Sequence, residues 1–543
     1  MIWDYVMAQK GEPKDGGAAG AYPSAQAARF QPQLLVHGLS RDPDRPLLHL
    51  PDGGVITVGT FRDMVSRYAQ ALVTAGAGPG TRVGMLSANR PEVLVVTAAC
   101  LINRHVLVPM HPIGSLDDHL HIVTDAGIEH LVFDPGRFDE RAAAIGAVVG
   151  ESCALWPLGP CPAGRDLDAL AAAMMPAPLV APQVHAEEPY RLSYTGGTTG
   201  KPKAIVGVHR TGLAVVQIQL AEWEWPAEVR QLVCAPLSHA GAAMFLPTLL
   251  RGGSMVILPA FDPVEVMEAI ELHRITCVML VPTMIYALLD HPRFDDFDLS
   301  SLETIFYGAS PMAPARLKEG IERLGPIFFQ FYGQVEAPMT ISVLRRAEHD
   351  PDDPFRLASC GRAVPWVRVA LLDDAMREVP DGEPGEICVQ GPLVMAGYHG
   401  RPEQTAEALA GGWLHTGDVA VRDEGGFLRI VDRKKDMIIT GGFNVYPREI
   451  EDVLGSHPAV SNCAVIGMPD ERWGEAVAAV VALRPGAEPC ADALIALVRE
   501  RKGAVQAPKS IFFVPALPLT AVGKPDKKRL RAEIATMKDR ANA

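Results

Sequence analysis

Short apolar runs rich in β-branched residues alternate with helical stretches over much of this chain. A buried helix is predicted at 92–101, and strands are predicted at 82–86, 106–109, 231–235, 255–258 and 278–281. Strands separated by helices are typical of α/β layers in which most strands run parallel. The pattern therefore predicts an α/β fold, with two such sheet units between residues 30 and 370.

The pattern changes twice towards the C-terminus. Alternating stretches at 369–373 and 386–389, with a Pro-Asp-Gly turn between them, predict a small β-rich subdomain of antiparallel strands. After Asp432 a short α+β unit follows, with a helix at 447–454 and strands at 460–467 and 476–483. A chain of 543 residues is too long for one core. We predict a large N-terminal domain, 1–432, and a small mobile lid domain, 433–543.

Composition excludes several classes of protein. The net charge of −14 argues against a nucleic-acid surface, and the basic residues near 524–531 are interpreted by default as a solvated face. Nine scattered cysteines without a CxxC pair indicate neither a zinc site nor a disulfide framework, which fits a reducing cytoplasm. The N-terminus lacks the build of a secretory signal, and the apolar stretch at 93–102 is too short to span a bilayer.

A loop at residues 194–203, with the sequence YTGGTTGKPK, can fold its backbone around a polyphosphate. Glycines permit a positive φ and a close approach, so that successive N–H groups, threonine hydroxyls and lysine charges reach anionic oxygens. The spacing is not that of a P-loop, since only three residues separate Gly196 from Gly200 and Pro202 follows Lys201. The alternative is a flexible surface loop. The candidate phosphate-binding residues are Thr195, Gly196, Gly197, Thr198, Thr199, Gly200, Lys201 and Lys203.

Further segments follow this loop in a set order, namely YGQVE at 332–336, GWLHTGD at 412–418, DRKKD at 432–436 and GK at 523–524. Together with the loop they resemble the acyl-adenylate-forming enzymes, a superfamily of acyl-CoA synthetases, peptide-synthetase adenylation domains and luciferases. The resemblance runs from about Thr57 to Arg531. It implies ATP-dependent activation of a carboxylic acid to acyl-AMP with release of pyrophosphate, then transfer to CoA, with Mg²⁺ as cofactor.

The resemblance assigns roles for the first half-reaction. Lys524 matches the catalytic lysine that reaches the carboxylate and the α-phosphate, where charge accumulates during the attack. Glu336 is the Mg²⁺ candidate, because a hard cation prefers a carboxylate. Asp418 matches the acid that accepts both ribose hydroxyls, and Arg433 reaches the same region. The adenine pocket is expected to include Gly308, Ala309, Ser310, Tyr332 and Gly333.

In the second half-reaction, pyrophosphate must leave the site and a thiol must enter it. The resemblance implies that the C-terminal lid domain rotates between the two half-reactions. Lys435 sits at the hinge of the family. Rotation exchanges Lys524 for the segment containing Gly441 and Gly442, whose missing side chains leave room for a pantetheine arm. His239 matches the ring that gates this tunnel.

Val335 departs from the family, where a threonine hydroxyl usually reaches the α-phosphate. Loss of one hydrogen bond to a charged oxygen is worth ~1.5–3 kcal/mol, so we expect weaker adenylation unless another donor compensates. The departure bears on the rate and leaves the reaction type unchanged.

Small residues after His239 bear on the choice of acid. Gly241, Ala242 and Ala243 leave volume where related aryl-acid ligases carry larger side chains. The other candidates for an apolar acyl pocket are Met244, Phe306, Tyr307, Pro338 and Met339. These residues predict a bulky hydrophobic acid. The segment lacks the aspartate that would pair with an α-ammonium group, which disfavours amino acids.

Several alternatives stay open at this point. An acyl-AMP ligase that loads a carrier protein often carries an insertion after the hinge, and none is evident between Arg433 and Glu449. Val335 motivates a nucleotide-binding pseudoenzyme, against which Lys524, Glu336 and Asp418 together argue. Luciferase-like oxidation also stays open, because it requires no additional motif by which the sequence could be tested for it. The expected partners are a small carboxylic acid, ATP and CoA, and a homodimer is one option for the oligomeric state.

Overall fold

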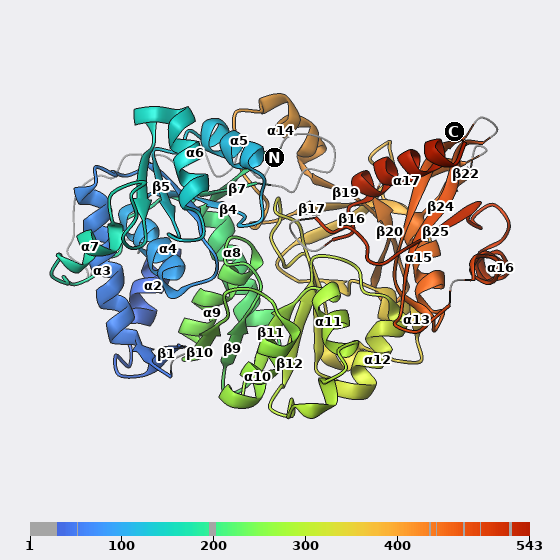
Figure 1. Cartoon of the computed structure of the whole chain (residues 1–543), viewed down its shortest axis with the longest axis horizontal. Coiled ribbons are helices and arrows are strands. Elements are labelled where there is room, and N and C mark those ends of the chain that lie inside the picture. Colours follow the sequence, from blue (N-terminus) through green and yellow to red (C-terminus); the bar gives the residue numbers. More distant parts are fainter. Residues whose placement is uncertain are drawn as a thin grey trace, which may run out of the picture.

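The computed structural model describes residues 30–50, 53–194, 202–433, 436–440, 443–470, 473–488, 490–520 and 524–542. Two large α/β sheets, a four-stranded antiparallel sheet and a five-stranded sheet are found in this part of the chain. The last sheet, with its helices, lies to one side of the others (Figure 1). The predicted α/β fold class, with a large N-terminal and a smaller C-terminal domain, is confirmed.

The seven-stranded sheet has the order β18-β8-β7-β4-β3-β5-β6. Strands β7, β4, β3, β5 and β6 run parallel, whereas β8 is antiparallel to both of its neighbours, β7 and β18. The predicted buried helix is α4 (Pro91–Asn103), which starts on a proline and ends at a left-handed Arg104. The strands are β3 (Arg82–Leu86), β4 (Val106–Met110), β5 (His130–Phe133), β6 (Ala154–Pro157), β7 (Pro189–Tyr194), β8 (Ala204–Val208) and β18 (Gly397–Tyr398).

The nine-stranded sheet has the order β15-β14-β13-β12-β11-β9-β10-β1-β2. Its six inner strands, from β13 to β1, are parallel, and they carry the continuous apolar runs typical of strands covered on both faces. The strands are β1 (Pro46–His49), β2 (Val55–Thr57), β9 (Arg230–Val233), β10 (Ser254–Ile257), β11 (Cys277–Leu280), β12 (Thr304–Gly308), β13 (Phe328–Tyr332), β14 (Ser342–Leu344) and β15 (Arg362–Ala363).

The two smaller sheets follow in the sequence. The antiparallel sheet consists of β16 (Arg368–Leu372), β17 (Gly385–Gln390), β19 (Leu414–Arg422) and β20 (Leu428–Arg433), and it is the predicted β-rich subdomain. The C-terminal sheet consists of β21 (Ile438–Thr440), β22 (Phe443–Val445), β23 (Val460–Asp470), β24 (Gly474–Leu483) and β25 (Ser510–Val514). We call the described residues from 436 to 542 the C-terminal unit. The predicted domain boundary at 432/433 falls one residue before the end of β20, and it stays a prediction.

Helices cover the sheets and occupy the crossovers (Figure 1). Within the described residues, no helix combines the length and apolarity needed to cross a bilayer. The remaining helices are α2 (Gln31–Leu39), α3 (Val58–Thr74), α5 (Leu116–Ala126), α6 (Asp139–Val149), α7 (Leu167–Ala172), α8 (His209–Glu222), α9 (Phe245–Leu250), α10 (Pro263–His273), α11 (Pro282–Leu289), α12 (Pro314–Leu324), α13 (Pro354–Ala358), α14 (Pro402–Ala408), α15 (Pro447–Gly455), α16 (Ala491–Lys502) and α17 (Lys527–Asn542).

Candidate functional site

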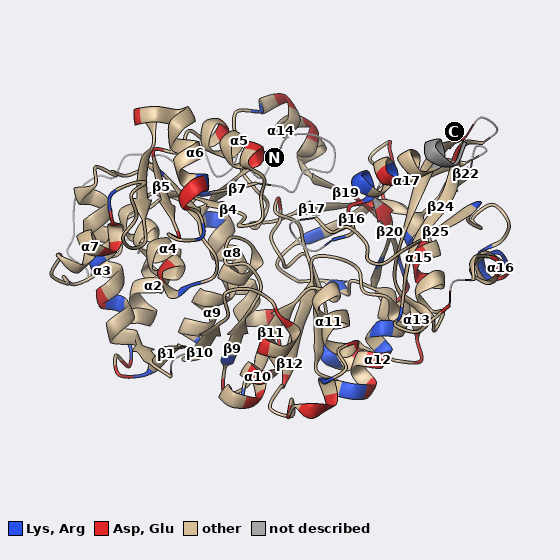
Figure 2. Cartoon of the chain, in the orientation of Figure 1, with Lys and Arg blue, Asp and Glu red and all other residues tan. Residues whose placement is uncertain are grey.

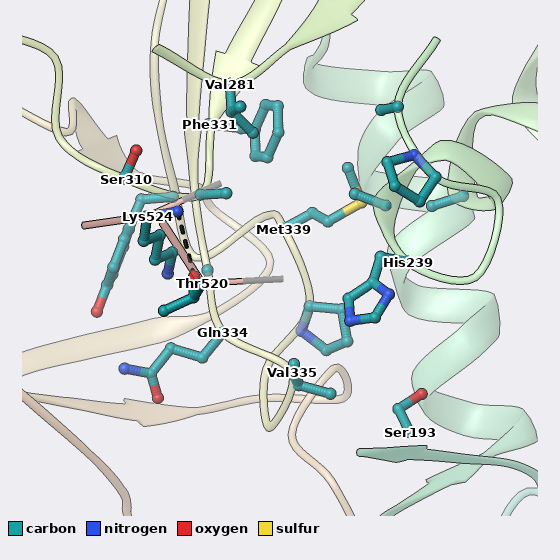
Figure 3. A pocket seen from close by; sticks show the side chains of 18 of the residues that line it. Ser193, His239, Val281, Ser310, Phe331, Gln334, Val335, Met339, Thr520 and Lys524 are labelled. Atoms are coloured by element: carbon teal, nitrogen blue, oxygen red, sulfur yellow. Dashed lines mark hydrogen bonds between the residues drawn. The ribbon is translucent and has the colours of Figure 1, made fainter. Parts of the chain in front are cut away.

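A cavity of about 1780 Å³ lies where both large sheets, the antiparallel sheet and the C-terminal unit meet. Its walls include the carboxyl ends of β7, β11 and β13, which is where ligands bind in open α/β sheets. In Figure 3, Lys524 and Ser310 lie on one side of the pocket, His239 and Ser193 lie on the other, and Met339 and Val335 lie between them.

Asp418 is the centre of a buried hydrogen-bond network on the cavity wall. Its Oδ2 atom accepts bonds from the Tyr332 hydroxyl at 2.7 Å and from Gln334 Nε2 at 2.6 Å. Desolvation, together with the Asp418 charge, raises the pKa of Tyr332 well above its ordinary value. Asp418 and Arg433 are register partners on β19 and β20, so the strand pairing brings the two predicted ribose residues together.

The predicted adenine loop only partly faces the cavity. Ala309 and Ser310 line it, and Ala309 has a φ of 66°, a value rare for a residue with a side chain and often found at ligand sites. Gly308 precedes these two residues and is not itself among the residues that line the cavity, so its place in the adenine pocket stays a prediction. A Cβ at this position would lie 2.3 Å from the Phe331 carbonyl oxygen, so glycine is required here by the contact between β12 and β13.

Glu336 projects into the cavity beside Tyr398 and Lys203. Its Oε1 atom accepts a hydrogen bond from the Tyr398 hydroxyl at 3.0 Å, and Lys203 Nζ is 5.3 Å from the centroid of the Tyr398 ring. Burial and the Glu336 charge raise the pKa of Tyr398. A cavity-wall carboxylate beside a lysine of the predicted phosphate loop fits Mg²⁺, which is bound by few carboxylates together with phosphate oxygens.

Lys524 reaches the cavity from the C-terminal unit. Its backbone N–H donates to Thr520 Oγ1 at 3.2 Å, and the Thr520 N–H donates to the Lys524 carbonyl oxygen at 2.7 Å. Both residues line the cavity (Figure 3). The structure therefore places Lys524 at the same cavity as Glu336 and Asp418, although the three residues come from distant parts of the sequence.

His239 and His111 form a pair on the opposite wall. Their ring centroids are 4.8 Å apart in an edge-to-face arrangement, and both rings line the cavity. Desolvation lowers the pKa of His239 to about 3 and that of His111 to about 4. Both imidazoles are therefore uncharged at neutral pH, which suits a ring that borders an apolar channel.

The predicted acyl residues divide into two groups. Ala242, Ala243, Pro338 and Met339 line the cavity. Gly241 and Met244 are not among its described lining residues, which corrects their prediction. A Cβ on Gly241 would lie 2.6 Å from the Ala235 carbonyl oxygen, so this glycine faces the backbone of its own loop.

Three apolar side chains predicted for the pocket are core residues instead. Met244 is 1% exposed and packs in a hydrophobic cluster. Phe306 packs against Trp223 and Trp225, at centroid distances of 4.9 and 5.0 Å. Tyr307 is fully buried, and its hydroxyl bonds to His349 Nε2 at 2.9 Å. The strand β12 turns both side chains away from the cavity.

Some predicted residues fall outside the part of the chain that the structure describes. They are Thr195, Gly196, Gly197, Thr198, Thr199, Gly200 and Lys201 of the loop, Lys435 of the hinge, and Gly441 and Gly442 of the CoA segment. The side chain of Arg433 also lies outside it. Gly333 lines the cavity, and a Cβ there would lie 2.4 Å from the Met339 nitrogen.

Sequence reasoning missed three residues that contact predicted ones. Gln334 binds Asp418, Tyr398 binds Glu336, and His111 packs on His239. Gln334 lies inside a recognised motif and could have been found there. Tyr398 and His111 are far from their partners in sequence, and only the pairing of β18 with β8 and the end of β4 bring them to the site.

Comparisons with known proteins agree with this geometry. The AMP-binding enzyme family matches residues 36–399, and the AMP-binding enzyme C-terminal domain matches residues 449–524. The chain is 51% identical to a medium/long-chain-fatty-acid–CoA ligase, FadD8 of Mycobacterium tuberculosis, over 92% of this chain and 89% of that protein. It is 39% identical to a feruloyl-CoA synthase of an Amycolatopsis species, over 88% of this chain and 94% of the relative.

A solved structure is similar over nearly the same length. The amide bond synthetase McbA of Marinactinospora thermotolerans superposes with a TM-score of 0.84 at 35% identity, covering 92% of this chain and 99% of the other. The similarity therefore includes the C-terminal unit as well as the large sheets.

Proposed function

The chain belongs to the AMP-binding enzyme family, and we propose that it is an AMP-forming acyl-CoA ligase for a hydrophobic carboxylic acid. It activates the acid with ATP, releasing pyrophosphate, and transfers the acyl group from acyl-AMP to CoA. The observation that carries this conclusion is one cavity lined by Glu336, Asp418 and Lys524.

Each of these three cavity residues has a separate role in adenylate formation. Asp418, held by Tyr332 and Gln334, presents a carboxylate to the ribose hydroxyls. Lys524 supplies a positive charge where the acid's carboxylate attacks the α-phosphorus, so that charge developing on both groups is stabilised. Glu336 would hold Mg²⁺, which neutralises phosphate charge when bound.

Val335 lines this cavity and packs against the apolar cluster that contains Tyr332. It offers no hydroxyl to the phosphate. The named relatives are ligases and synthetases, which supports a catalytic chain over a pseudoenzyme. We propose that Val335 affects the rate of adenylation and not the type of reaction.

The apolar side chains on the cavity wall support a hydrophobic acid. Ala242 and Ala243 leave space, and Val281, Phe331 and Met339 add apolar surface (Figure 3). The named fatty-acid and feruloyl relatives act on acids with large apolar parts, in line with this choice. The acid we propose is a medium- or long-chain acid or an aryl-substituted one.

An acid panel tests the proposal. Purified protein is mixed with ATP, Mg²⁺ and acids from acetate to palmitate, including ferulate, with and without CoA. We expect pyrophosphate release and acyl-CoA, measured by mass spectrometry, for the apolar members of the panel. Pyrophosphate release without any CoA thioester would point to a carrier-protein ligase, and no release with any acid would point to a pseudoenzyme.

Because Ala242 is one of the predicted acyl-pocket residues that line the cavity, we make a prediction for Ala242→Phe. A phenyl ring here fills cavity volume, so kcat/KM should fall by about 10- to 200-fold for the longest acid accepted and change little for short acids. The measurement is kcat/KM across the panel at saturating ATP and CoA. Gly241→Ala is the matched control, and it should impair all acids alike because its Cβ meets backbone. A uniform loss in Ala242→Phe would remove this residue from the acyl pocket.

A cytoplasmic location and a homodimer stay predictions. The nine cysteines are all free thiols, and eight of them are at least partly buried, which supports a reducing compartment.

A further inference from the structure

Arg484 joins the C-terminal unit to two helices of the N-terminal part. It follows β24, whereas Asp290 follows α11 and Glu319 lies on α12. Arg484 Nη2 is 3.0 Å from Glu319 Oε2, and Arg484 Nη1 is 3.9 Å from Asp290 Oδ1. One side chain of the C-terminal unit thus bridges two carboxylates of the N-terminal part.

Arg316 holds these two carboxylates from the other side. Its side chain is 2% exposed, with Nη2 2.7 Å from Asp290 Oδ1 and Nη1 2.6 Å from Glu319 Oε2. Because the buried Arg316 guanidinium fixes the orientation of Asp290 and Glu319, both carboxylates are already in place to pair with Arg484 when the C-terminal unit docks. The four residues Asp290, Arg316, Glu319 and Arg484, which we call the Arg484 cluster, balance two negative with two positive charges. Basic and acidic residues are mixed around α12 in Figure 2.

Other contacts join the same surfaces. Ser461 Oγ donates to Asp290 Oδ2 at 3.4 Å, and Arg448 Nη2 donates to the Met312 carbonyl oxygen at 3.0 Å. Helices α12 and α15 also pack together. Arg316, Arg448 and Ser461 line the cavity, so this contact lies at the edge of the site that Lys524 enters.

We propose that Arg484 is a positioning residue for adenylate formation. It does not line the cavity. It acts through the C-terminal unit, which the Arg484 cluster holds in the orientation that brings Lys524 to the cavity. The side chains of Arg484, Asp290 and Glu319 are 33%, 24% and 25% exposed, so water can replace these pairs when the unit turns for the second half-reaction. The inference rests on the proposed two-step function.

The first test separates the half-reactions in Arg484→Ala. Acyl-AMP formation, followed as pyrophosphate release without CoA, should slow about tenfold, within the 5- to 150-fold range of typical coupling between sites. Thioester formation from supplied acyl-AMP and CoA should be unchanged or faster. Arg499→Ala is the matched control, because it removes the same charge from an exposed position on α16 and should leave both rates unaltered.

A series of charges at position 484 distinguishes a positioning role from an effect on folding. Arg484→Glu should slow acyl-AMP formation more than Arg484→Ala does, because it faces two carboxylates. Arg484→Lys keeps a positive charge near Asp290 and Glu319 without disturbing Arg316, and it should retain most of the rate. Equal slowing of both half-reactions in Arg484→Ala, or an Arg484→Lys variant no faster than Arg484→Glu, would overturn the proposal.

A measurement without turnover keeps this proposal separate from the proposed function. An ideal Cβ on Gly455 lies 3.4 Å from Ala313 Cβ, across the same contact. In the background Ala313→Cys/Gly455→Cys, disulfide formation reports how often the unit occupies this orientation. We expect Arg484→Ala to slow this cross-link about tenfold and Arg499→Ala to leave it unchanged. An unaltered cross-linking rate in Arg484→Ala refutes the positioning role, whatever acid the protein accepts.

Discussion

Lys524→Ala is expected to lose most acyl-adenylate formation, by about 10²- to 10³-fold, which is typical for removal of one group that stabilises developing charge. The physical reason is the place of this lysine at the cavity that also holds Glu336 and Asp418. Thioester formation from supplied acyl-AMP should stay nearly intact, because we propose that Lys524 serves only the orientation seen here. Pyrophosphate release and acyl-CoA formation, measured separately, check both statements.

Lys509→Ala is the control for this experiment. Lys509 is exposed on the C-terminal unit, and its ammonium bonds to the Ala504 carbonyl oxygen away from the cavity. It should leave both rates as they are. If Lys524→Ala lowers the rates of both half-reactions equally, the proposal that this lysine acts in the first step alone is contradicted.

Much of the fold could be predicted because its signals are local. The apolar runs that became β3, β4 and β9 to β11 are buried on both faces, and such runs stand out in any short window of sequence. The motifs containing Tyr332, Asp418 and Lys524 could be recognised for the same reason. Each is a short segment whose order along the chain carries information.

The remaining features of the site could not be predicted, because they depend on the direction in which a side chain points and on contacts between residues far apart in the sequence. Gly241 was expected to open the acyl pocket, but the short turn after His239 points its missing side chain at the Ala235 carbonyl oxygen. Tyr398 is 62 residues from Glu336, and no spacing rule connects them. Phe306 and Tyr307 are adjacent, so a strand must send them to opposite faces, and both faces of β12 are core.

The orientation of the C-terminal unit leads to the second large expected effect. An ideal Cβ on Gly455 lies 3.4 Å from Ala313 Cβ, close to the Cβ separation of about 3.8 Å found in disulfides. Ala313→Cys/Gly455→Cys should therefore cross-link under mild oxidation. Since both positions border the cavity, the link holds the unit where Lys524 reaches it.

We expect the cross-linked protein to form acyl-AMP at close to the rate of its reduced form but to make acyl-CoA at least about 100-fold more slowly, because a closed covalent loop forbids the rotation that the second step needs. Reductant should restore acyl-CoA formation in the same sample, and each single cysteine variant should behave like the parent protein. Peptide mapping without reductant must locate the link at 313–455, since the half-buried Cys463 also borders the cavity.

If the linked protein makes acyl-CoA as fast as the reduced protein, both half-reactions proceed in the orientation seen here. Lys524 would then have to serve both steps, and the roles of the hinge and of Arg484 would fall with the rotating lid.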